Sequence, residues 1–431
     1  MPPLPPPALS LWGDTAGAPP HTAPLAQDTS CDVAIVGGGY AGLHAALTLA
    51  EAGLSTLILE AGDIASGGSG RNGGVVSAKF RRSYPDLARH HGLETARQMY
   101  DIAQGSVRHL EESLERLNLN DTGFRKSGAL KCAHTAKALA RIHDETAWIE
   151  HAFGSSAHRL LDAQELHQET GSDIFHGGVL QKDAGTIHPL RYLLGLAGAV
   201  AGQGIALHTR TPVQTLAEEP DGVILETPGG RVRAGQVLLA TNAYSSLTRA
   251  TDTVARCLVP FRSAIIATQP LPAELSQRIL PSGRSYTETH RMMRWFRKHE
   301  GRVLFGGRGA LGALESPAAF QRLEKAMRHT FPDLRGLKID YRWSGYVALT
   351  LDGLPQAGSL SPRISYAAGF NGAGVAMSGY VGHQIARAML GRPCALGLIH
   401  REEPRKLPFY ALRSVAVRAA TCGYELLDML E

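Results

Sequence analysis

A glycine-rich turn near the N-terminus has the residue types and the spacing to bind a dinucleotide. It follows the apolar run Val33–Val36 directly and consists of Gly37, Gly38, Gly39, Tyr40, Ala41 and Gly42. Gly37 allows a tight turn after a strand, Gly39 lets the backbone approach a pyrophosphate, and Gly42 lets a helix pack closely on the strand. Free N–H groups and the dipole at the start of that helix favour the phosphate charge.

An acidic residue lies where such a unit needs one. Glu60 ends a second apolar run, Thr56–Leu59, and follows Gly42 by 18 positions. This is close to the roughly 20 expected for a carboxylate that accepts hydrogen bonds from an adenosine ribose, and it disfavours a 2′-phosphorylated nucleotide. The complete order of strand, turn, helix, strand and acid argues against an ordinary glycine turn, but it does not separate FAD from NAD.

A second glycine-rich loop, residues 65–74, favours a flavin. Its candidate cofactor contacts are Ser69, Arg71, Asn72, Gly73 and Gly74. Glycines around an arginine and an asparagine suggest a backbone that passes close to a flat, polar ligand, with Arg71 and Asn72 projecting toward it. The alternative is a flexible linker, which seldom precedes an apolar pair such as Val75-Val76 directly.

Two segments far along the chain support the same interpretation. The apolar run Val237–Leu239 would place Thr241 and Asn242 at the carboxyl edge of the sheet, where open α/β sheets bind ligands. A further glycine-rich helix start supplies Gly369, Asn371, Gly372, Gly374 and Val375, and Val213 completes the candidate cofactor contacts. A dinucleotide has one pyrophosphate, so this helix start needs another partner. The pyrimidine end of a flavin fits, because it gains negative charge on reduction; a turn that only packs is the alternative.

With these motifs the chain resembles the FAD-dependent D-amino-acid oxidase superfamily. The resemblance is carried by residues 32–40, 69–74, 240–244, 343–345 and 350–355 with Gly358, and it covers nearly the whole chain. The Ser-Gly-Arg-Asn-Gly-Gly form of the second loop and the leader that contains Trp12 are most similar to the group of γ-glutamylputrescine oxidases and L-pipecolate oxidases.

The resemblance implies a flavoenzyme that oxidises a C–N bond of an amine or amino acid. In this family a hydride passes from the carbon bearing the amine to flavin N5, water hydrolyses the imine, and O2 is reduced to H2O2. A γ-glutamylputrescine-like primary amine is the favoured substrate, and L-pipecolate or a D-amino acid is the alternative. Some sarcosine-oxidising relatives attach flavin to a cysteine, but residues 341–350 contain none, so we expect non-covalent FAD.

The predicted architecture is α/β: a Rossmann-type FAD-binding domain and a discontinuous α+β substrate domain whose antiparallel sheet roofs the flavin. At 431 residues the chain exceeds the roughly 250–300 at which single cores stop growing. We expect an extension at 1–27, the FAD-binding domain at 28–84, 185–250 and 340–400, the substrate domain at 85–184 and 251–339, and a C-terminal helical tail at 401–431. Helical patterns occupy 85–119, 136–151, 189–200 and 376–390, and a hairpin joins 292–296 to 303–307.

Three residues are candidates for the catalytic side of the site. Arg308 follows the apolar strand end Leu304–Gly307 and could face the flavin or a substrate carboxylate, whereas a solvated charged face is the alternative for the arginines around it. The resemblance places Trp343 and Tyr346 beside the flavin as aromatic walls, against the alternative of plain core aromatics. His44, two positions past Gly42, and His188, before Pro189 at an expected helix start, are interpreted as structural rather than as bases.

Composition argues against several other classes of protein. The hydrophobic content of 44% and charged content of 19% are typical of a globular chain, and a net charge of +5 without a basic tail gives little support for nucleic-acid binding. Five scattered cysteines without C-x-x-C spacing suggest a reducing cytoplasm and no metal site. No run reaches the roughly 18 apolar residues of a membrane span. Leu11 and Trp12 could anchor the proline-rich leader.

Three hypotheses therefore stand side by side. An oxidase that uses O2 is the leading one. A dehydrogenase of the same fold would pass electrons to a quinone or carrier protein, and the amphipathic pattern at 408–430, which we expect to dock on the domain rather than on a membrane, would be its docking feature. A non-catalytic flavin-binding module is the third, and the expected roofing sheet and aromatic walls argue against it.

Overall fold

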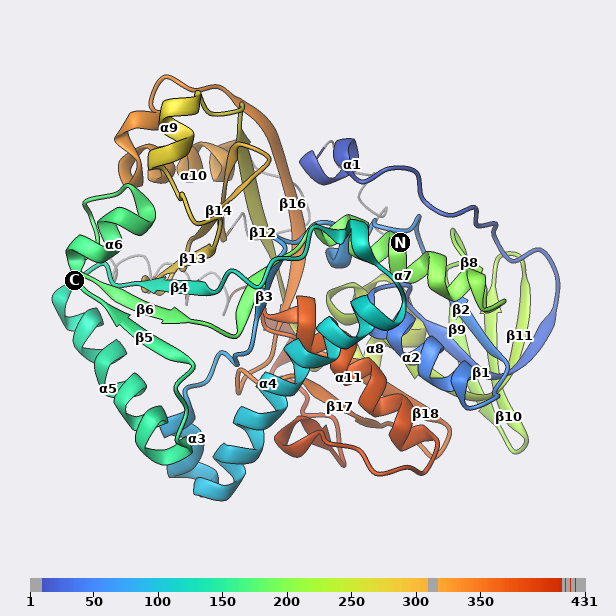
Figure 1. The fold of residues 1–431 in the computed structure, drawn as a ribbon. Coiled ribbons are helices and arrows are strands. Elements are labelled where there is room, and N and C mark those ends of the chain that lie inside the picture. Colours follow the sequence, from blue (N-terminus) through green and yellow to red (C-terminus); the bar gives the residue numbers. More distant parts are fainter. Residues whose placement is uncertain (1–9, 309–316, 413–414, 416–418, 420–422, 424–431) are drawn as a thin grey trace.

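The computed structural model describes residues 10–308 and 317–412, together with Val415, Ala419 and Gly423. Two large sheets organise these residues, and helices from distant parts of the chain pack between and around them (Figure 1). The chain passes from one sheet to the other more than once, as the predicted discontinuous arrangement requires.

The first sheet is built around the predicted nucleotide-binding unit. At its centre, β1 (Thr29–Val36) pairs in parallel with β2 (Thr56–Leu59), and α2 (Tyr40–Glu51) joins them. The four residues of β2 and the last four of β1 are all buried, because a parallel strand covered on both faces needs a continuous apolar run. The strand order is β19-β17-β18-β11-β1-β2-β8.

The remaining strands of this sheet come from the second half of the chain. They are β8 (Ala206–His208), β11 (Gly230–Leu239), β17 (Gln356–Ser359), β18 (Ile364–Ala368) and β19 (His400–Arg401), with β9 (Thr215–Glu219) and β10 (Gly222–Thr227) extending it beside β11. β11 and β18 run parallel to β1, so their carboxyl ends lie at the same edge as the glycine-rich turn. This edge is where open α/β sheets bind ligands.

The second sheet contains the predicted hairpin. Its order is β16 (Ile339–Leu349), β12 (Val259–Thr268), β15 (Arg302–Arg308), β14 (Trp295–His299), β13 (Ser285–Glu288), β4 (Ala129–Cys132), β6 (Gly178–Gln181) and β5 (His158–Leu161). All neighbours are antiparallel except β4 and β13. The hairpin turn is shorter than predicted, because Glu300 and Gly301 both have positive φ, +46° and +71°, and form a tight two-residue connection. Figure 1 shows α9 (Ala273–Arg278) and α10 (Pro317–Thr330) near the end of this sheet.

One strand within the range predicted for the FAD-binding domain belongs to the second sheet. Strand β16 lies in the range assigned to the FAD-binding domain, but it pairs along its length with β12 of the second sheet. The crossing back to the first sheet therefore occurs after Leu349. An apolar strand pattern predicts a strand but not the sheet to which the strand belongs. A small ladder of β3 (Val75–Ser77) and β7 (Ala184–Thr186) forms a separate two-stranded sheet.

The long helices match their predicted segments closely. The first pattern is divided at Gly92, whose φ of +87° separates α3 (Tyr84–His91) from α4 (Leu93–Arg116). The others are α5 (Ala136–Phe153), α7 (Pro189–Gly202) and α11 (Gly374–Met389), and a shorter α6 (Ala163–Thr170) follows β5. None of the described helices is long and apolar enough to cross a membrane.

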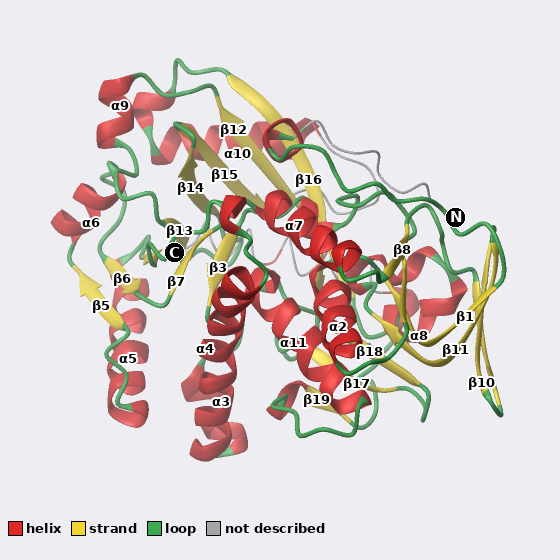
Figure 2. Ribbon diagram, turned by 45° about the vertical axis from the view of Figure 1, so that its right-hand side comes forward, coloured by secondary structure: helices red, strands yellow, loops and turns green. Residues whose placement is uncertain are grey.

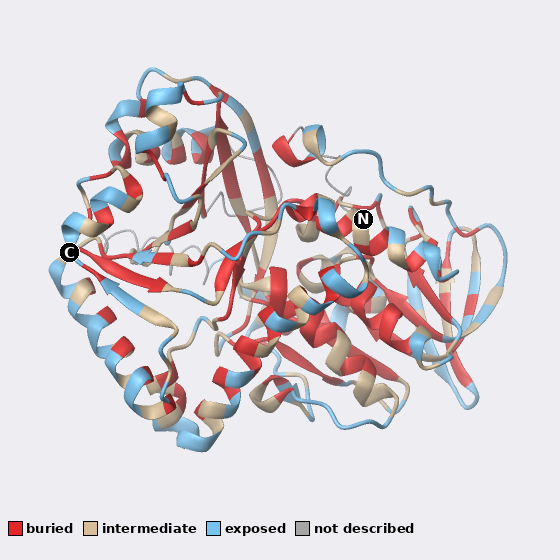
Figure 3. Ribbon diagram, viewed as in Figure 1, coloured by how far each residue is buried: buried red, intermediate tan, exposed pale blue. Residues whose placement is uncertain are grey.

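Helices α2 and α11 pack together beside the first sheet with very little space between their backbones (Figure 2). A Cβ on Gly382 would lie 2.1 Å from the carbonyl oxygen of Ala41, and a Cβ on Gly379 would lie 2.8 Å from the ring of His44. Figure 3 shows that buried residues are concentrated where these helices meet the strands. Both helices therefore approach the ligand-binding edge from the same layer.

The leader is anchored as predicted. Ser10 caps a short helix, α1 (Leu11–Thr15), by accepting a hydrogen bond from the N–H of Gly13, and both Leu11 and Trp12 are buried. The predicted C-terminal helix at 408–430 lies mostly outside the described residues, apart from a 3-10 turn at Tyr410–Leu412.

A group of three histidines, of which His44 is buried and His109 and His383 are partly buried, lies among α2, α4 and α11. His44 shares hydrogen bonds with the hydroxyl of Tyr192 (2.8 Å) and with His109 (3.0 Å), whose ring stacks on His383 with centroids 4.8 Å apart. Burial and the neighbouring cationic groups lower the pKa of His44 well below its ordinary value, lower that of His109 to about 3, and also lower that of His383. These shifts favour the neutral form of each ring in the folded protein.

We expect the free energy of unfolding to fall as the pH is lowered from about 6.5 toward 5. The unfolded chain binds protons on these histidines in this range and the folded chain does not, so each group costs up to about 1.4 kcal/mol per pH unit. Urea denaturation of the wild type and of His109→Gln over this range measures the effect. The variant should show a shallower pH dependence, and His21→Gln, at an exposed position, is the matched control. Equal slopes in all three proteins would contradict the assignment.

Candidate functional site

A long cleft lies at the carboxyl edge of the first sheet and encloses about 1360 Å³, including its open mouth. Segments distant in the sequence line it: residues 36–41, 59–61, 67–69, 240–242, 346–348 and 370–372, with Asn72 and Val213. Most of the predicted cofactor contacts are thus brought together on one surface. The lining joins the first glycine-rich turn, the end of β2 and the start of α11, which is the combination of segments that a dinucleotide site needs.

The first glycine-rich turn has the geometry that its spacing predicts. Gly37 has a φ of +114°, and a Cβ on Gly42 would lie only 2.0 Å from the carbonyl oxygen of Gly37. Gly42 does not line the cleft. Its lack of a side chain lets α2 pack against the turn. A Cβ on Gly39 would lie 2.9 Å from the hydroxyl oxygen of Ser69, so the backbone here forms a narrow cradle.

Glu60 faces this cradle from the end of β2. One carboxylate oxygen accepts a hydrogen bond from the N–H of Gly38 (2.8 Å) and the other from the N–H of Gly62 (2.9 Å). Burial raises the pKa of Glu60, and these backbone hydrogen bonds act in the opposite direction by favouring the anion. These two hydrogen bonds fix the orientation of the carboxylate at the cleft.

The second glycine-rich loop divides into residues that face the cleft and residues that lie behind it. Asn72 and Ser69 line the cleft. The amide of Asn72 donates to the carbonyl oxygen of Ser69 (2.8 Å) and accepts from the N–H of Gly74 (2.8 Å), which fixes the turn. Ser69 also accepts a hydrogen bond from the N–H of Tyr40, the first residue of α2, at 3.2 Å.

Arg71 is directed away from the cleft, in contrast to the prediction. Its side chain is buried and donates to the carbonyl oxygens of Ser66 (3.0 Å) and Ser344 (3.2 Å). Gly73 is needed for packing, because a Cβ there would lie 2.3 Å from the ring of Trp295, and Gly74 has a φ of +65°. These three residues support the loop from behind instead of lining the cavity.

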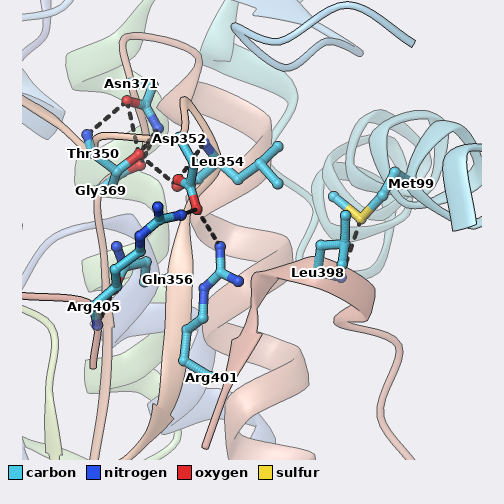
Figure 4. A network of polar contacts seen from close by, with 10 residues as sticks. All are labelled: Met99, Thr350, Asp352, Leu354, Gln356, Gly369, Asn371, Leu398, Arg401 and Arg405. Atoms are coloured by element: carbon cyan, nitrogen blue, oxygen red, sulfur yellow. Dashed lines mark hydrogen bonds and ion pairs between the residues drawn. The ribbon is translucent and has the colours of Figure 1, made fainter. Parts of the chain in front are cut away.

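The end of β11 and the glycine-rich turn before α11 meet at the start of α11. Asn242 accepts a hydrogen bond from the N–H of Gly369 (2.9 Å), which ties the end of β11 to the turn before α11. Asn371 accepts from the N–H of Thr350 (3.0 Å) and donates to the carbonyl oxygen of Gly369 (2.6 Å) (Figure 4). Gly369 shapes the turn without lining the cleft, whereas Thr241, Gly372, Gly374 and Val375 lie on its wall.

The candidate catalytic residues occupy different places. Tyr346 lines the cleft, its ring lies edge-on to that of Tyr244 at 5.5 Å, and the guanidinium of Arg262 lies 4.5 Å from its centroid. Trp343 is fully buried behind the second loop and donates from its indole N–H to the carbonyl oxygen of Arg71 (3.0 Å), so it is not part of the cleft wall. Arg308 ends β15 opposite Ser263, and its side chain lies outside the described part of the chain.

The two histidines interpreted as structural have structural roles. His44 belongs to the group of histidines among α2, α4 and α11, and His188 caps α7 by accepting the N–H of Arg191 (3.1 Å).

Sequence reasoning missed several wall residues, among them Tyr244, Leu247, Thr248, Phe370 and Ser378. Tyr244 and Phe370 lie within motifs that were recognised from the sequence. Their position as aromatic residues just after a strand end could have predicted that they line the cleft. Within the described residues no cluster of His, Cys, Asp and Glu side chains is arranged to hold a metal ion.

Comparison with known proteins identifies the class to which this fold and cleft belong. Residues 32–388 match the DAO family of FAD dependent oxidoreductases, and the chain belongs to this family. Gamma-glutamylputrescine oxidoreductase of Escherichia coli (strain K12) is 32% identical over 368 residues, 85% of each chain. Probable oxidoreductase OrdL of Haemophilus influenzae is 30% identical over 412 residues, 94% of each chain.

Solved structures show the same fold. Glycine oxidase from Geobacillus kaustophilus superposes with a TM-score of 0.74 at 22% identity, over 86% of this chain and 98% of that one. L-amino acid deaminase from Proteus vulgaris gives a TM-score of 0.70 at 19% identity, over 89% and 96%. The predicted family, the α/β fold and FAD as the cofactor are thereby confirmed.

The residues of the cleft fit FAD on their own geometry. A Cβ at Gly39 would displace the hydroxyl of Ser69, and this cradle meets the N-terminus of α2, which suits a pyrophosphate. Glu60 lies beside it for the ribose, and the N-terminus of α11 faces the same cavity through Gly372 and Gly374. FAD carries negative charge on its pyrophosphate and, when reduced, on the pyrimidine side of its flavin. The starts of α2 and α11 both face the cleft, so each can stabilise one of these regions.

Gly39→Glu should reduce the FAD content of the purified protein at least about tenfold. The new side chain would collide with Ser69 and place a carboxylate where the pyrophosphate binds. The ratio of flavin absorbance to protein absorbance measures this. Gly198→Glu is the matched control, because Gly198 lies on α7 with open space around its Cβ position. Normal flavin content in the Gly39 variant would show that the nucleotide site is wrongly placed.

Proposed function

We propose that this protein oxidises the C–N bond of an amine or amino acid, with a γ-glutamylputrescine-like primary amine as the favoured substrate and O2 as the electron acceptor. The observation that carries the proposal is one continuous cleft that joins the dinucleotide cradle, the start of α11 and the aromatic wall of Tyr346. The similarity to gamma-glutamylputrescine oxidoreductase of Escherichia coli over 85% of the chain supports this choice of substrate class.

FAD, when bound, accepts the hydride from the carbon that bears the amine, and water then hydrolyses the imine. The residues of the chain bind and orient. The turn at Gly37–Gly42 and the start of α2 hold the pyrophosphate, Glu60 holds the ribose, and the start of α11 stabilises negative charge on the pyrimidine side. Tyr346 and Tyr244 form a wall that excludes water from the reacting carbon.

The proposal requires no general base, because the reacting amine need only be neutral. This agrees with His44 and His188, which are both engaged in structural hydrogen bonds. Non-covalent FAD is also proposed. Burial raises the pKa of Cys31 to about 12 and that of Cys257 to about 11, and that of Cys132 well above its ordinary value, so these thiols are poor nucleophiles.

The visible spectrum of the purified protein under anaerobic conditions, before and after each candidate substrate, tests the proposed reaction. We expect γ-glutamylputrescine to bleach the flavin bands and O2 to restore them with release of H2O2. Bleaching by L-pipecolate or a D-amino acid instead would support the alternative substrates. Bleached flavin that O2 restores only slowly, but a quinone restores rapidly, would identify a dehydrogenase. Flavin that none of these compounds bleaches would contradict the proposed chemistry.

Arg308 is proposed to hold the substrate carboxylate from the end of β15. Arg308→Ala should raise KM roughly 10- to 100-fold for a substrate with a carboxylate, the usual effect of losing a charge-assisted hydrogen bond. KM for a matched amine without a carboxylate should change little. Steady-state kinetics with both substrates measures the difference, with Arg322→Ala on the exposed face of α10 as control. An unchanged KM for both would assign Arg308 to the solvated face.

A further inference from the structure

The loop that borders the cleft at Asn72 is held from behind through its backbone. Four consecutive carbonyl oxygens, those of residues 71–74, each accept a hydrogen bond from a buried side chain. Trp343 donates to Arg71 (3.0 Å), and Trp12 donates to Asn72 (2.8 Å). Arg297 donates to the next two carbonyls, at 3.1 Å and 2.8 Å. These donors come from β16, α1 and β14, three elements distant in sequence.

Trp12 is enclosed completely where it makes this contact. Its ring is fully buried and lies edge-on to those of His188, His299 and Trp343, with centroids 4.8, 5.0 and 6.0 Å away. The guanidinium of Arg297 lies 5.8 Å from the same ring. Trp12 therefore connects the loop, the start of α7 and the second sheet in one contact.

Helix α1 is fastened to the domain by polar contacts as well. The carbonyl oxygen of Thr15 accepts from two nitrogens of Arg191 (3.0 and 2.8 Å), and its hydroxyl shares a hydrogen bond with His188 (2.9 Å). Arg191 and His188 both lie at the start of α7. The match to the DAO family begins at residue 32, so helix α1 lies outside the matched residues while its partners on α7 lie within them.

We propose that Trp12 is a positioning residue for the cofactor: helix α1 is a strap that fixes the backbone of residues 71–74 and so presents Asn72 to FAD in one orientation. Asn72 links both sides of this arrangement. Its carbonyl oxygen is bound by Trp12, while its side chain, bonded to Ser69 and to the N–H of Gly74, lines the cleft. Loss of the indole N–H leaves a buried carbonyl without its donor, and the loop relaxes toward other conformations.

Trp12→Phe in the full-length holoenzyme tests the proposal, because phenylalanine keeps an aromatic ring and removes only the donor and part of the volume. FAD affinity, measured by titration of the apoprotein with FAD, should weaken about tenfold. The visible circular dichroism of bound flavin should also change, because it reports the asymmetry around the ring. Trp148→Phe, a half-buried tryptophan of α5 packed against Phe153, is the matched control.

The stability of the apoprotein separates positioning from general loss of structure. Urea denaturation of the apo forms should show that both variants are fully folded without denaturant, although Trp12→Phe has the lower midpoint because a buried carbonyl loses its donor. Only Trp12→Phe should alter FAD affinity and flavin dichroism. Ser10→Ala, which removes the cap of α1 and leaves Trp12 in place, should give a smaller change in the same direction. The proposal is wrong if Trp12→Phe binds FAD with wild-type affinity and dichroism, or if Trp148→Phe produces the same changes. These readouts need no substrate, so they stand apart from the test of the proposed reaction.

Discussion

Close approach of backbone to backbone is the constraint on which the site depends. Helix α2 packs on the end of β1 because position 42 has no side chain, and α11 packs on α2 because position 382 has none. At either position a Cβ would lie about 2 Å from a carbonyl oxygen, at 2.0 and 2.1 Å, a distance that no rotamer relieves. These two contacts bring the N-termini of two helices to the same cleft, where backbone dipoles can stabilise both electronegative regions of a cofactor.

Side chains buried around the cleft maintain this geometry mainly without formal charge. The histidines between α2, α4 and α11 remain neutral, and Tyr40 places its hydroxyl 2.8 Å from the carbonyl oxygens of both Ser69 and Pro189. Buried arginines, among them Arg71, Arg262 and Arg297, are the exceptions. The guanidinium of Arg297 binds carbonyl oxygens of residues 73, 74 and 187, and burial lowers its pKa to about 9. A buried guanidinium thus holds three backbone carbonyl groups in place.

Local spacing was enough to predict the nucleotide-binding unit, because each glycine and Glu60 act within one strand-turn-helix-strand segment. Other features depend on contacts that no local pattern encodes. Arg71 was expected in the cleft and instead binds the carbonyl oxygen of Ser344, 273 positions away. Trp343 was expected beside the flavin, but its side chain lies on the face of β16 opposite the cavity. Strand β16 pairs with β12, although the strands that follow it in sequence belong to the first sheet. The direction of a loop side chain and the partner of a strand are settled by tertiary packing.

The order of strands in the first sheet has a consequence for biosynthesis. β1 and β2 are among the first segments to leave the ribosome. β11, which pairs with the other side of β1, and β18, which pairs with β11, follow about 200 and 330 residues later. Until they arrive, β1 has an apolar edge with free N–H and C=O groups, which is a template for pairing with another chain. A nascent or truncated chain that ends before Ala368 therefore cannot complete its central sheet. Such fragments are expected to depend on chaperones, and assembly of the sheet is slow because its contacts are so distant in sequence.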